Sequence, residues 1–252
     1  SFGPHPGRAL LWRPSMGEKA ILITGGAGFV GSSVALHLKK QRPQQRVIAL
    51  DNLKRRGSEL NLARLRDAGV DFIHGDVRQR SDLLALPTIG AVVECSAEPS
   101  VLAGYGPQAD YVVDTNLMGT VNCLALAARD KADVVFLSTS RVYPIDPLNA
   151  ACEEVNGRFA PRANAATGLS ERGISEDFTL EGVRTLYGAT KLASELLLRE
   201  YAAMHGFRFT VDRFGVIAGP WQMGRTDQGF VLWWLTRHHW QLPLNYIGFG
   251  GT

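Results

Sequence analysis

The stretch Thr24-Gly25-Gly26-Ala27-Gly28-Phe29-Val30-Gly31 determines the fold of this 252-residue chain. It follows an apolar run at residues 20–23 and precedes a helical pattern at residues 32–40, so it predicts a strand, a glycine turn and a helix. The glycine spacing fits both G-x-G-x-x-G and G-x-x-G-x-x-G, and both let the backbone approach a pyrophosphate at a helix N-terminus. We therefore expect a dinucleotide site at this turn, although such glycines also serve ordinary turns.

A second apolar run, at residues 47–50, ends in Asp51. An acidic residue about 20 residues beyond the glycines accepts hydrogen bonds from the ribose hydroxyls of NAD. Lys54, Arg55 and Arg56 follow closely and could instead bind the 2′-phosphate of NADP. The sequence therefore favours NAD and leaves NADP open.

The composition is that of an ordinary globular protein with a full core, since 45% of its residues are hydrophobic. A net charge of +3 with scattered basic residues argues against nucleic-acid and membrane partners and allows an anionic small-molecule ligand. No apolar run approaches the roughly 18 residues that span a bilayer. Cys95, Cys123 and Cys152 show neither a disulfide pattern nor a metal-ligand pattern, so we expect a cytoplasmic protein without a metal site.

Apolar runs alternate with segments of helical period along the chain, which is the pattern of βαβ units and a parallel sheet. We expect strands at 20–24, 47–51, 71–73, 91–95, 133–138 and 209–213, and helices at 29–40, 58–67, 81–85, 111–129 and 187–205. The predicted fold class is α/β, with a doubly wound parallel Rossmann sheet. Residues 144–184 interrupt the alternation, and we expect them to form a long excursion over the active face.

Three regions are expected along the chain. Residues 1–15 lack periodicity and are interpreted as a disordered leader or a remnant of cloning. Residues 16–217 would form the NAD-binding Rossmann domain, and residues 218–252 would begin a small substrate-binding domain. Residues 244–247 resemble a strand, and the glycine-rich stretch after them suggests that the C-terminal portion is truncated.

Two short motifs carry candidate catalytic groups. Tyr187 and Lys191 stand four residues apart, so on a helix they share one face. A nearby cation stabilises a phenolate, so the pKa of Tyr187 is expected to fall from about 10 toward neutrality, which would make it a general base. Ser138-Thr139-Ser140 ends a predicted strand at the sheet edge where ligands bind, and a hydroxyl there could share a proton with the phenol. The alternatives are a surface tyrosine beside a solvated lysine, and a helix cap or turn.

The combination resembles the extended short-chain dehydrogenases/reductases, in particular the NAD-dependent epimerase/dehydratase family of nucleotide-sugar enzymes. The resemblance extends from Lys19 to Thr252. It is carried by T-G-G-A-G-F-V-G at 24–31, Asp51-Asn52-Leu53, Gly75-Asp76-Val77, Asn116 with Gly119-Thr120, S-T-S-R-V-Y at 138–143, Y-G-A-T-K at 187–191, and Arg213 with Gly219-Pro220.

The resemblance implies a role for each matching residue. The catalytic residues would be Thr139, Tyr187 and Lys191. The NAD-binding residues would be Gly25, Gly28, Phe29, Val30, Gly31, Asp51, Asn52, Leu53, Arg55, Ser58, Asp76, Val77, Ser96, Ala97, Asn116 and Ser138, together with Tyr187 and Lys191. The substrate-binding residues would be Thr139, Ser140, Arg141, Gln222, Asp227 and Gln228. The resemblance also implies a homodimer formed through the helices at 111–129 and 187–205.

Finer features are most similar to the CDP-paratose (CDP-tyvelose) 2-epimerases. These features are residues 51–59, Gly173-Ile174-Ser175-Glu176, and Gln222 with Asp227-Gln228-Gly229. The similarity implies NAD-dependent epimerisation of a CDP-linked sugar through a transient keto intermediate. A UDP-hexose 4-epimerase, which uses the same residues on another carbon, is the alternative, and a non-catalytic NAD-binding sensor is the alternative of another class.

Two departures from the family pattern bear on these alternatives. Glu94-Cys95-Ser96-Ala97 stands where the family usually has His-x-Ala-Ala, which leaves the sugar and the nucleotide base open. Ser140-Arg141 follows Thr139 where the 4,6-dehydratases of the family carry Asp-Glu. Because eliminating water needs an acid and a base beyond the tyrosine, and a guanidinium cannot replace a carboxylic acid, a dehydratase is not expected.

Overall fold

The computed structural model describes residues 19–107, 109–162, 165–170, 172–225 and 228–245. A six-stranded sheet has the strand order β10-β5-β4-β1-β2-β3, and every neighbouring pair in it is parallel. The strands are β1 (Ala20–Thr24), β2 (Val47–Asp51), β3 (Asp71–His74), β4 (Ile89–Glu94), β5 (Asp133–Thr139) and β10 (Phe209–Phe214). This is the order of a doubly wound dinucleotide-binding sheet, so the predicted fold class is confirmed.

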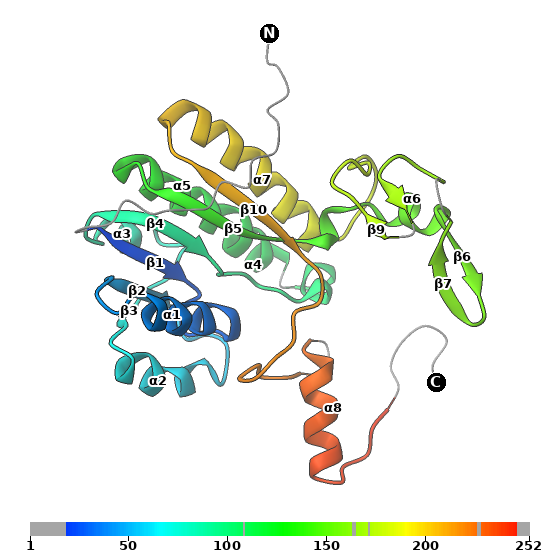
Figure 1. Cartoon of the computed structure of the whole chain (residues 1–252), viewed down its shortest axis with the longest axis horizontal. Helices are drawn as coiled ribbons and strands as arrows, with labels where there is room; N and C mark the ends of the chain where they lie inside the picture. The colour runs from blue at the N-terminus through cyan, green and yellow to red at the C-terminus, as the bar shows by residue number, and fades with distance from the viewer. Residues whose placement is uncertain (1–18, 108, 163–164, 171, 226–227, 246–252) are drawn as a thin grey trace.

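Helices cover both faces of the sheet (Figure 1). The described helices are α1 (Phe29–Gln41), α2 (Asn61–Asp67), α3 (Arg80–Leu84), α4 (Ala109–Val113), α5 (Gly119–Asp130), α6 (Ile145–Ala150), α7 (Leu186–His205) and α8 (Phe230–His239). Alternate residues of a strand point to opposite faces. In β1, Leu22 therefore packs into the buried cluster that holds Leu124 of α5 and Leu198 of α7, while Ile21 packs into the cluster that holds Ala35 of α1.

The helix predicted at residues 111–129 is interrupted in the structure. A π-helical turn, Asp114–Met118, joins α4 to α5, and turns of this kind are frequent at functional sites. The helix predicted at residues 58–67 likewise begins as a short 3-10 turn, Ser58–Leu60, before α2. The spacing of apolar residues predicts a helix, but it does not predict where the backbone hydrogen bonds change from the α-helical pattern to the 3-10 or π-helical pattern.

The excursion at residues 144–184 holds more regular structure than the sequence predicts. Besides α6 it contains two antiparallel hairpins, β6 (Cys152–Val155) with β7 (Arg158–Pro161), and β8 (Leu169–Ser170) with β9 (Gly173–Ile174). A small buried cluster that includes Tyr143 and Phe178 anchors it. Figure 1 shows the excursion beyond the carboxyl end of β5, the sheet edge where ligands bind. Its strands are too short to show a period in the sequence.

Several predictions concern the ends of the chain. The strand predicted at residues 244–247 is not formed at Leu244 and Asn245, where the backbone has no regular structure. Its remainder and the predicted leader at residues 1–15 lie outside the described residues, and the domain boundaries stay predictions. Within the described ranges, no helix is both long and apolar enough to cross a membrane. The cytoplasmic location stays a prediction.

Candidate dinucleotide and substrate site

The glycine turn after β1 is packed too closely against its surroundings to admit side chains. Gly25 has a φ of +62°, and a Cβ there would lie 2.9 Å from the backbone of Ser96. A Cβ on Gly31 would lie 2.1 Å from the carbonyl oxygen of Gly25, so α1 packs directly on the turn. Gly28 begins α1 without a side-chain cap, and the first turn of α1 carries no acidic residue. The helix N-terminus is therefore suited to an anion such as a pyrophosphate.

Asp51 ends β2 beside this turn and is 9% exposed. Its Oδ2 accepts a hydrogen bond from the Ala27 N–H at 3.1 Å, and its Oδ1 accepts one from the Leu53 N–H at 2.8 Å. Burial raises the pKa of Asp51, and these backbone hydrogen bonds oppose the rise. Because each carboxylate oxygen accepts more than one hydrogen bond, Asp51 can also bind a ribose diol.

The predicted catalytic residues come together at the carboxyl edge of the sheet. Tyr187 lies in the first turn of α7, and Lys191 lies one turn later. Thr139, the last residue of β5, forms a side-chain hydrogen bond with the Tyr187 phenol. Lys191 is 2% exposed, and its ammonium donates to the carbonyl of Leu137 in β5 at 2.9 Å. The side chain of Thr185 caps α7 by accepting a hydrogen bond from the backbone, which fixes where the helix begins.

The electrostatics of this group differ from the sequence prediction. Burial raises the pKa of Tyr187, while the Thr139 hydrogen bond and the Arg141 charge oppose the rise. The prediction that Lys191 brings the pKa of Tyr187 down toward neutrality is therefore wrong for the chain by itself. The main cause is desolvation of the Tyr187 phenol. The Lys191 ammonium is bound to the Leu137 carbonyl, and burial lowers the pKa of Lys191 too.

A buried ion pair that the sequence analysis missed supports this edge. Glu195, one turn after Lys191 on α7, is 1% exposed and accepts a hydrogen bond from the Ser138 hydroxyl at 2.5 Å. Arg213 of β10 binds the same carboxylate at 2.7 Å, and this pairing raises the pKa of Arg213. The hydroxyl of Ser138, predicted to contact the cofactor, is thus engaged within the protein. The position of Glu195, four residues after Lys191, was the available signal.

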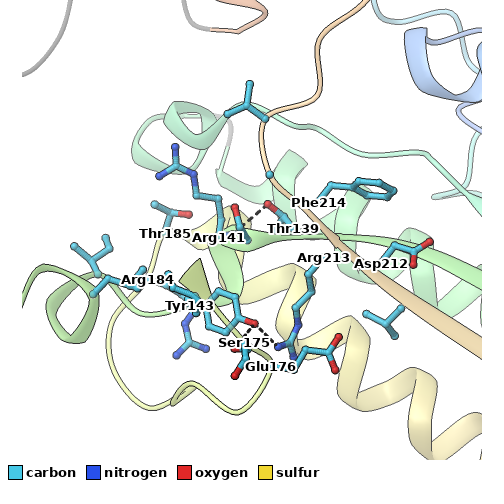
Figure 2. Close-up of a pocket in the computed structure, with 17 residues that line it drawn as sticks. Thr139, Arg141, Tyr143, Ser175, Glu176, Arg184, Thr185, Asp212, Arg213 and Phe214 are labelled. Atoms are coloured by element: carbon cyan, nitrogen blue, oxygen red, sulfur yellow. Dashed lines mark hydrogen bonds between the residues drawn. The ribbon is translucent and has the colours of Figure 1, made fainter. Parts of the chain in front are cut away.

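A cleft of about 870 Å³ opens at the carboxyl ends of β5 and β10 (Figure 2). Arg213 donates to the Tyr143 hydroxyl at 3.1 Å, and Tyr143 donates to the Ser175 carbonyl at 3.2 Å. These hydrogen bonds connect the excursion to the sheet. The cleft is lined by Thr139, Ser140, Arg141, Tyr143, Ile145, Leu148, Ile174, Ser175, Glu176, Arg184, Thr185, Val211, Asp212, Arg213, Phe214, Gly215 and Val216.

Only part of the predicted substrate set lines this cleft. The part that does is the group at the end of β5, namely Thr139, Ser140 and Arg141. Gln222 and Gln228 lie between β10 and α8, and neither is among the described residues that line the cleft. Asp227 lies outside the described residues. The substrate-binding roles of Gln222, Asp227 and Gln228 therefore stay predictions.

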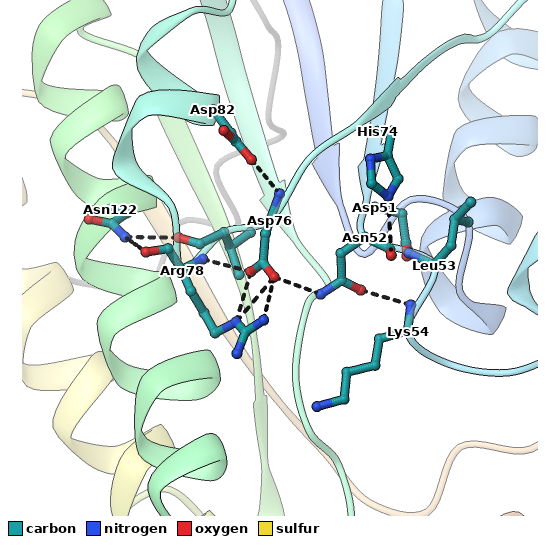
Figure 3. Close-up of polar contacts among 10 residues, drawn as sticks. Asp51, Asn52, Leu53, Lys54, His74, Asp76, Arg78, Asp82 and Asn122 are labelled. Carbon is teal, nitrogen blue, oxygen red and sulfur yellow. Dashed lines mark hydrogen bonds and ion pairs between the residues drawn. The ribbon is translucent and has the colours of Figure 1, made fainter.

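At the other end of the site, Asp76 holds the loops after β2 and β3 together (Figure 3). Asn52 donates to the Asp76 carboxylate at 3.0 Å, and the Arg78 guanidinium donates to it at 2.6 Å. Burial acts to raise the pKa of Asp76, but the hydrogen bonds from Arg78 and Asn52 outweigh it and lower the pKa to about 2. Asp76, predicted to bind NAD, thus also joins two loops. Arg78 was missed, because nothing in one sequence distinguishes it from other arginines.

The loop after β2 also contacts the segment that follows β10. The Arg55 guanidinium donates to the Met223 carbonyl at 3.0 Å, and the Ser58 hydroxyl donates to the Arg55 carbonyl at 2.7 Å. The Lys54 ammonium lies 3.1 Å from the centroid of the Tyr111 ring. The basic residues that left NADP open are therefore partly engaged with protein groups.

Two further predicted cofactor residues hold the loop after β4. Asn116, in the π-helical turn, has no exposed surface. Its side-chain oxygen accepts from the Glu98 N–H at 2.8 Å, and its side-chain nitrogen donates to the Glu98 carbonyl at 3.1 Å. The Ser96 hydroxyl forms a hydrogen bond with the Thr24 hydroxyl at 2.9 Å. Asn116 and Ser96 thus fix the loop against α4–α5 and β1, a role that their sequence motifs do not reveal.

Comparison with known proteins places these features in context. A family model described as "NAD dependent epimerase/dehydratase family" matches residues 21–251. The chain is 28% identical over 220 residues to CDP-paratose 2-epimerase of Salmonella typhi, which covers 84% of this chain and 62% of that protein. It is 30% identical over 228 residues to UDP-glucuronate 4-epimerase 1 of Arabidopsis thaliana, which covers 85% of this chain and 46% of that protein. The chain therefore spans less than two thirds of the length of either relative.

Solved structures show the same similarity. UDP-glucuronic acid 4-epimerase from Bacillus cereus, in complex with UDP-glucuronic acid and NAD, superimposes with a TM-score of 0.70 at 25% identity. That match covers 92% of this chain and 66% of the Bacillus chain.

Proposed function

The chain belongs to the NAD-dependent epimerase/dehydratase family, and from this premise we propose that it epimerises a nucleotide-linked sugar through a transient keto intermediate. The observation that carries the proposal is the group of Thr139, Tyr187 and Lys191 at the carboxyl edge of the sheet, beside the cleft. A hydroxyl, a phenol and an ammonium in this arrangement suit proton transfer to and from a sugar hydroxyl.

The residues present fit NAD as the resident cofactor. The N-terminus of α1 suits the pyrophosphate, and the Asp51 carboxylate suits the ribose hydroxyls. The negative charge of Asp51 disfavours the 2′-phosphate of NADP. The Lys191 ammonium can donate three hydrogen bonds, and one of them goes to the Leu137 carbonyl. Two therefore remain for the second ribose of NAD, the one that Asp51 does not bind. When bound, NAD supplies the hydride acceptor and then the hydride donor of the reaction.

Tyr187 is the proposed general base and acid. It takes the proton from the sugar hydroxyl, and returns it when the ketone is reduced from its other face. Thr139 hydrogen-bonds the phenol and lines the cleft, so its hydroxyl can hold the substrate oxygen and relay the proton. Because burial raises the pKa of Tyr187, the phenolate needs a cation, and Arg141 supplies one from the cleft. The complete cycle consumes no redox equivalent.

For the substrate we propose a CDP-linked sugar inverted at C2, as the name of the Salmonella relative indicates for that protein. A UDP-hexose inverted at C4 is the alternative, since 4-epimerases are similar to this chain to a like extent. The charge of Arg141 beside Thr139 in the cleft argues against a dehydratase, which needs a carboxylic acid near the substrate.

A homodimer through α4, α5 and α7 belongs to the same proposal. Leu196 and Met204 of α7 are 58% and 74% exposed, and a second copy would cover them. Analytical ultracentrifugation that shows only monomer would remove this part of the proposal.

The test is an assay of the chain with CDP-linked and UDP-linked sugars, together with mass spectrometry of the small molecules released on denaturation. We expect inversion of a CDP-sugar at C2, no net NADH, and nearly one NAD per chain. Inversion of a UDP-hexose at C4 would select the alternative. Bound NAD with no turnover of either class would favour the sensor, and bound NADP would overturn the role of Asp51.

A further inference from the structure

The segment that follows β10 packs back onto the part of the sheet edge that suits NAD. Residues 219–223, here called the clasp, lie between β10 and α8 and run past the loop after β2 (Figure 1). At one end of the clasp, a Cβ on Gly219 would lie 3.3 Å from the ring of Phe29, the first residue of α1. At the other end, the Met223 carbonyl accepts a hydrogen bond from the Arg55 guanidinium at 3.0 Å. The clasp therefore contacts a predicted cofactor residue at each of its ends.

The middle of the clasp is connected to the glycine turn. The guanidinium carbon of Arg64, on α2, lies 3.9 Å from the centroid of the Trp221 ring, which is a cation–π contact. Arg64 also donates to the Asn61 side-chain oxygen at 2.6 Å, and the Asn61 nitrogen donates to the Ala27 carbonyl at 2.8 Å. Ala27 belongs to the turn that suits the pyrophosphate. A continuous chain of contacts thus runs from Trp221 to that turn.

The backbone is strained both in the clasp and in the loop that it contacts. Trp221 has a φ of +68°, and Leu53, in the loop after β2, has a φ of +54°. A residue other than glycine keeps this left-handed conformation only where the surrounding structure holds it. Leu53 is held by its hydrogen bond to Asp51, and the Trp221 ring is held by Arg64. Strain of this kind is typical of segments that clamp a ligand.

We propose that Trp221 is a positioning residue for the cofactor, whose ring, stacked on Arg64, fastens the clasp over the loop after β2 and so slows the release of NAD. The clasp continues the stretch of residues 214–216, which lines the cleft, so one segment borders both the cleft and the loop after β2. The need for retention rests on the proposed function, because an epimerase that returns the hydride to the same sugar must keep its reduced cofactor until then.

The test is the rate at which NAD bound to the protein exchanges with an excess of ¹³C-labelled NAD, followed by mass spectrometry. Trp221→Gly removes the ring and also relieves the left-handed backbone, which glycine adopts freely. Exchange should become about tenfold faster or more. Because Trp221 is 45% exposed and the strain is relieved, the free energy of unfolding of the cofactor-free protein should stay near that of wild type. Trp221→Phe keeps an aromatic ring against Arg64 and should recover most of the retention.

Two further variants sharpen the test. Trp240→Ala is the matched control, since Trp240 is 67% exposed and its ring contacts the neighbouring His239, so exchange should keep the wild-type rate. Arg64→Gln should speed exchange as Trp221→Gly does. The double variant should exchange little faster than the faster single variant, because the two side chains act through one contact.

An unchanged exchange rate in Trp221→Gly would overturn the proposal, and so would fully additive effects of the two substitutions. A parallel loss of stability in the cofactor-free protein would also overturn it, since Trp221 would then act through the fold. If Trp221→Gly does not fold, Arg64→Gln decides, and a wild-type exchange rate in it would overturn the proposal.

The exchange measurement needs no substrate, so a wild-type protein without epimerase activity refutes the proposed function and leaves the clasp testable. In an active enzyme, turnover of Trp221→Gly should fall when no NAD is supplied. It should return toward the wild-type value when NAD is added, because Thr139, Tyr187 and Lys191 are unchanged.

Discussion

Gly188 of α7 and Arg141 after β5 are in direct backbone contact, so that a Cβ on Gly188 would lie 2.1 Å from the Arg141 carbonyl oxygen. The contact places the segment after β5 on the first turn of α7, the turn that carries Tyr187. It explains why Thr139 can hydrogen-bond the phenol and why the Arg141 charge acts on it. The glycine of the Tyr-Gly-Ala-Thr-Lys motif is therefore required by packing.

Gly188→Ala should separate these two segments. We expect the free energy of unfolding to fall by about 1–3 kcal/mol, as for other overpacked sites, and turnover to fall by roughly tenfold or more, as expected for a displaced proton-transfer group. Urea unfolding and steady-state kinetics measure the two effects. Ala189→Ser, at the exposed neighbouring position, is the control and should change neither quantity appreciably. Wild-type turnover in Gly188→Ala would contradict the contact.

Tyr187→Phe removes the proposed acid and base. Turnover should fall roughly 10²-fold or more, the range of general acid–base catalysis, while NAD stays bound. Tyr143→Phe is a suitable comparison, because the Tyr143 phenol is buried and lines the cleft, with its hydroxyl engaged by Arg213 and Ser175. It should mainly lower stability, by about 1 kcal/mol. Equal losses of turnover in the two variants would argue against the assignment of Tyr187.

Asp51→Asn should weaken the preference for NAD. The neutral amide no longer repels a 2′-phosphate, so the ratio of the Kd for NADP to the Kd for NAD should fall about tenfold or more. A tenfold change corresponds to about 1.4 kcal/mol of binding free energy. Calorimetric titration of cofactor-stripped protein with each dinucleotide measures the ratio. Asp71→Asn is the matched control, since Asp71 is half exposed and paired with Arg46. The same ratio in wild type and Asp51→Asn would show that Asp51 does not select the cofactor.

The pair of Asp76 and Arg78 predicts a pH-dependent stability. The pKa of Asp76 is about 2 in the folded protein against its ordinary value of 3.8. A folded pKa below the unfolded one stabilises the fold above about pH 4, and this contribution is lost as pH falls toward 2. Arg78→Gln should therefore lower the free energy of unfolding near neutral pH. The loss should be at most about 1 kcal/mol, because the ion pair of Arg78 with Asp76 is partly exposed to solvent.

The measurement is urea unfolding of wild type and Arg78→Gln over a series of pH values. The difference between the two proteins should be constant near neutrality and should shrink as the pH falls below about 4. A difference that does not depend on pH would mean that Arg78 acts through packing and not through the charge of Asp76.

Local patterns in the sequence were sufficient for the fold. The central strands of a parallel sheet are buried on both faces, so β1 and β2 appear as continuous apolar runs with clear limits. The glycine turn is defined by spacing along the chain, and the shared face of Tyr187 and Lys191 follows from four residues on a helix. Each of these depends on neighbours in sequence, which is why they could be predicted.

Tertiary structure alone decided which groups meet and how they are charged. The ion pair of Glu195 with Arg213 joins helix α7 to strand β10, and no local period in the sequence records it. The pKa of Tyr187 rises where the sequence predicted a fall, because desolvation depends on everything packed around the phenol. Spacing along the chain therefore determined the strands of the parallel sheet and the main helices beside it, whereas burial and the order of strands in the sheet determined the chemistry of the site.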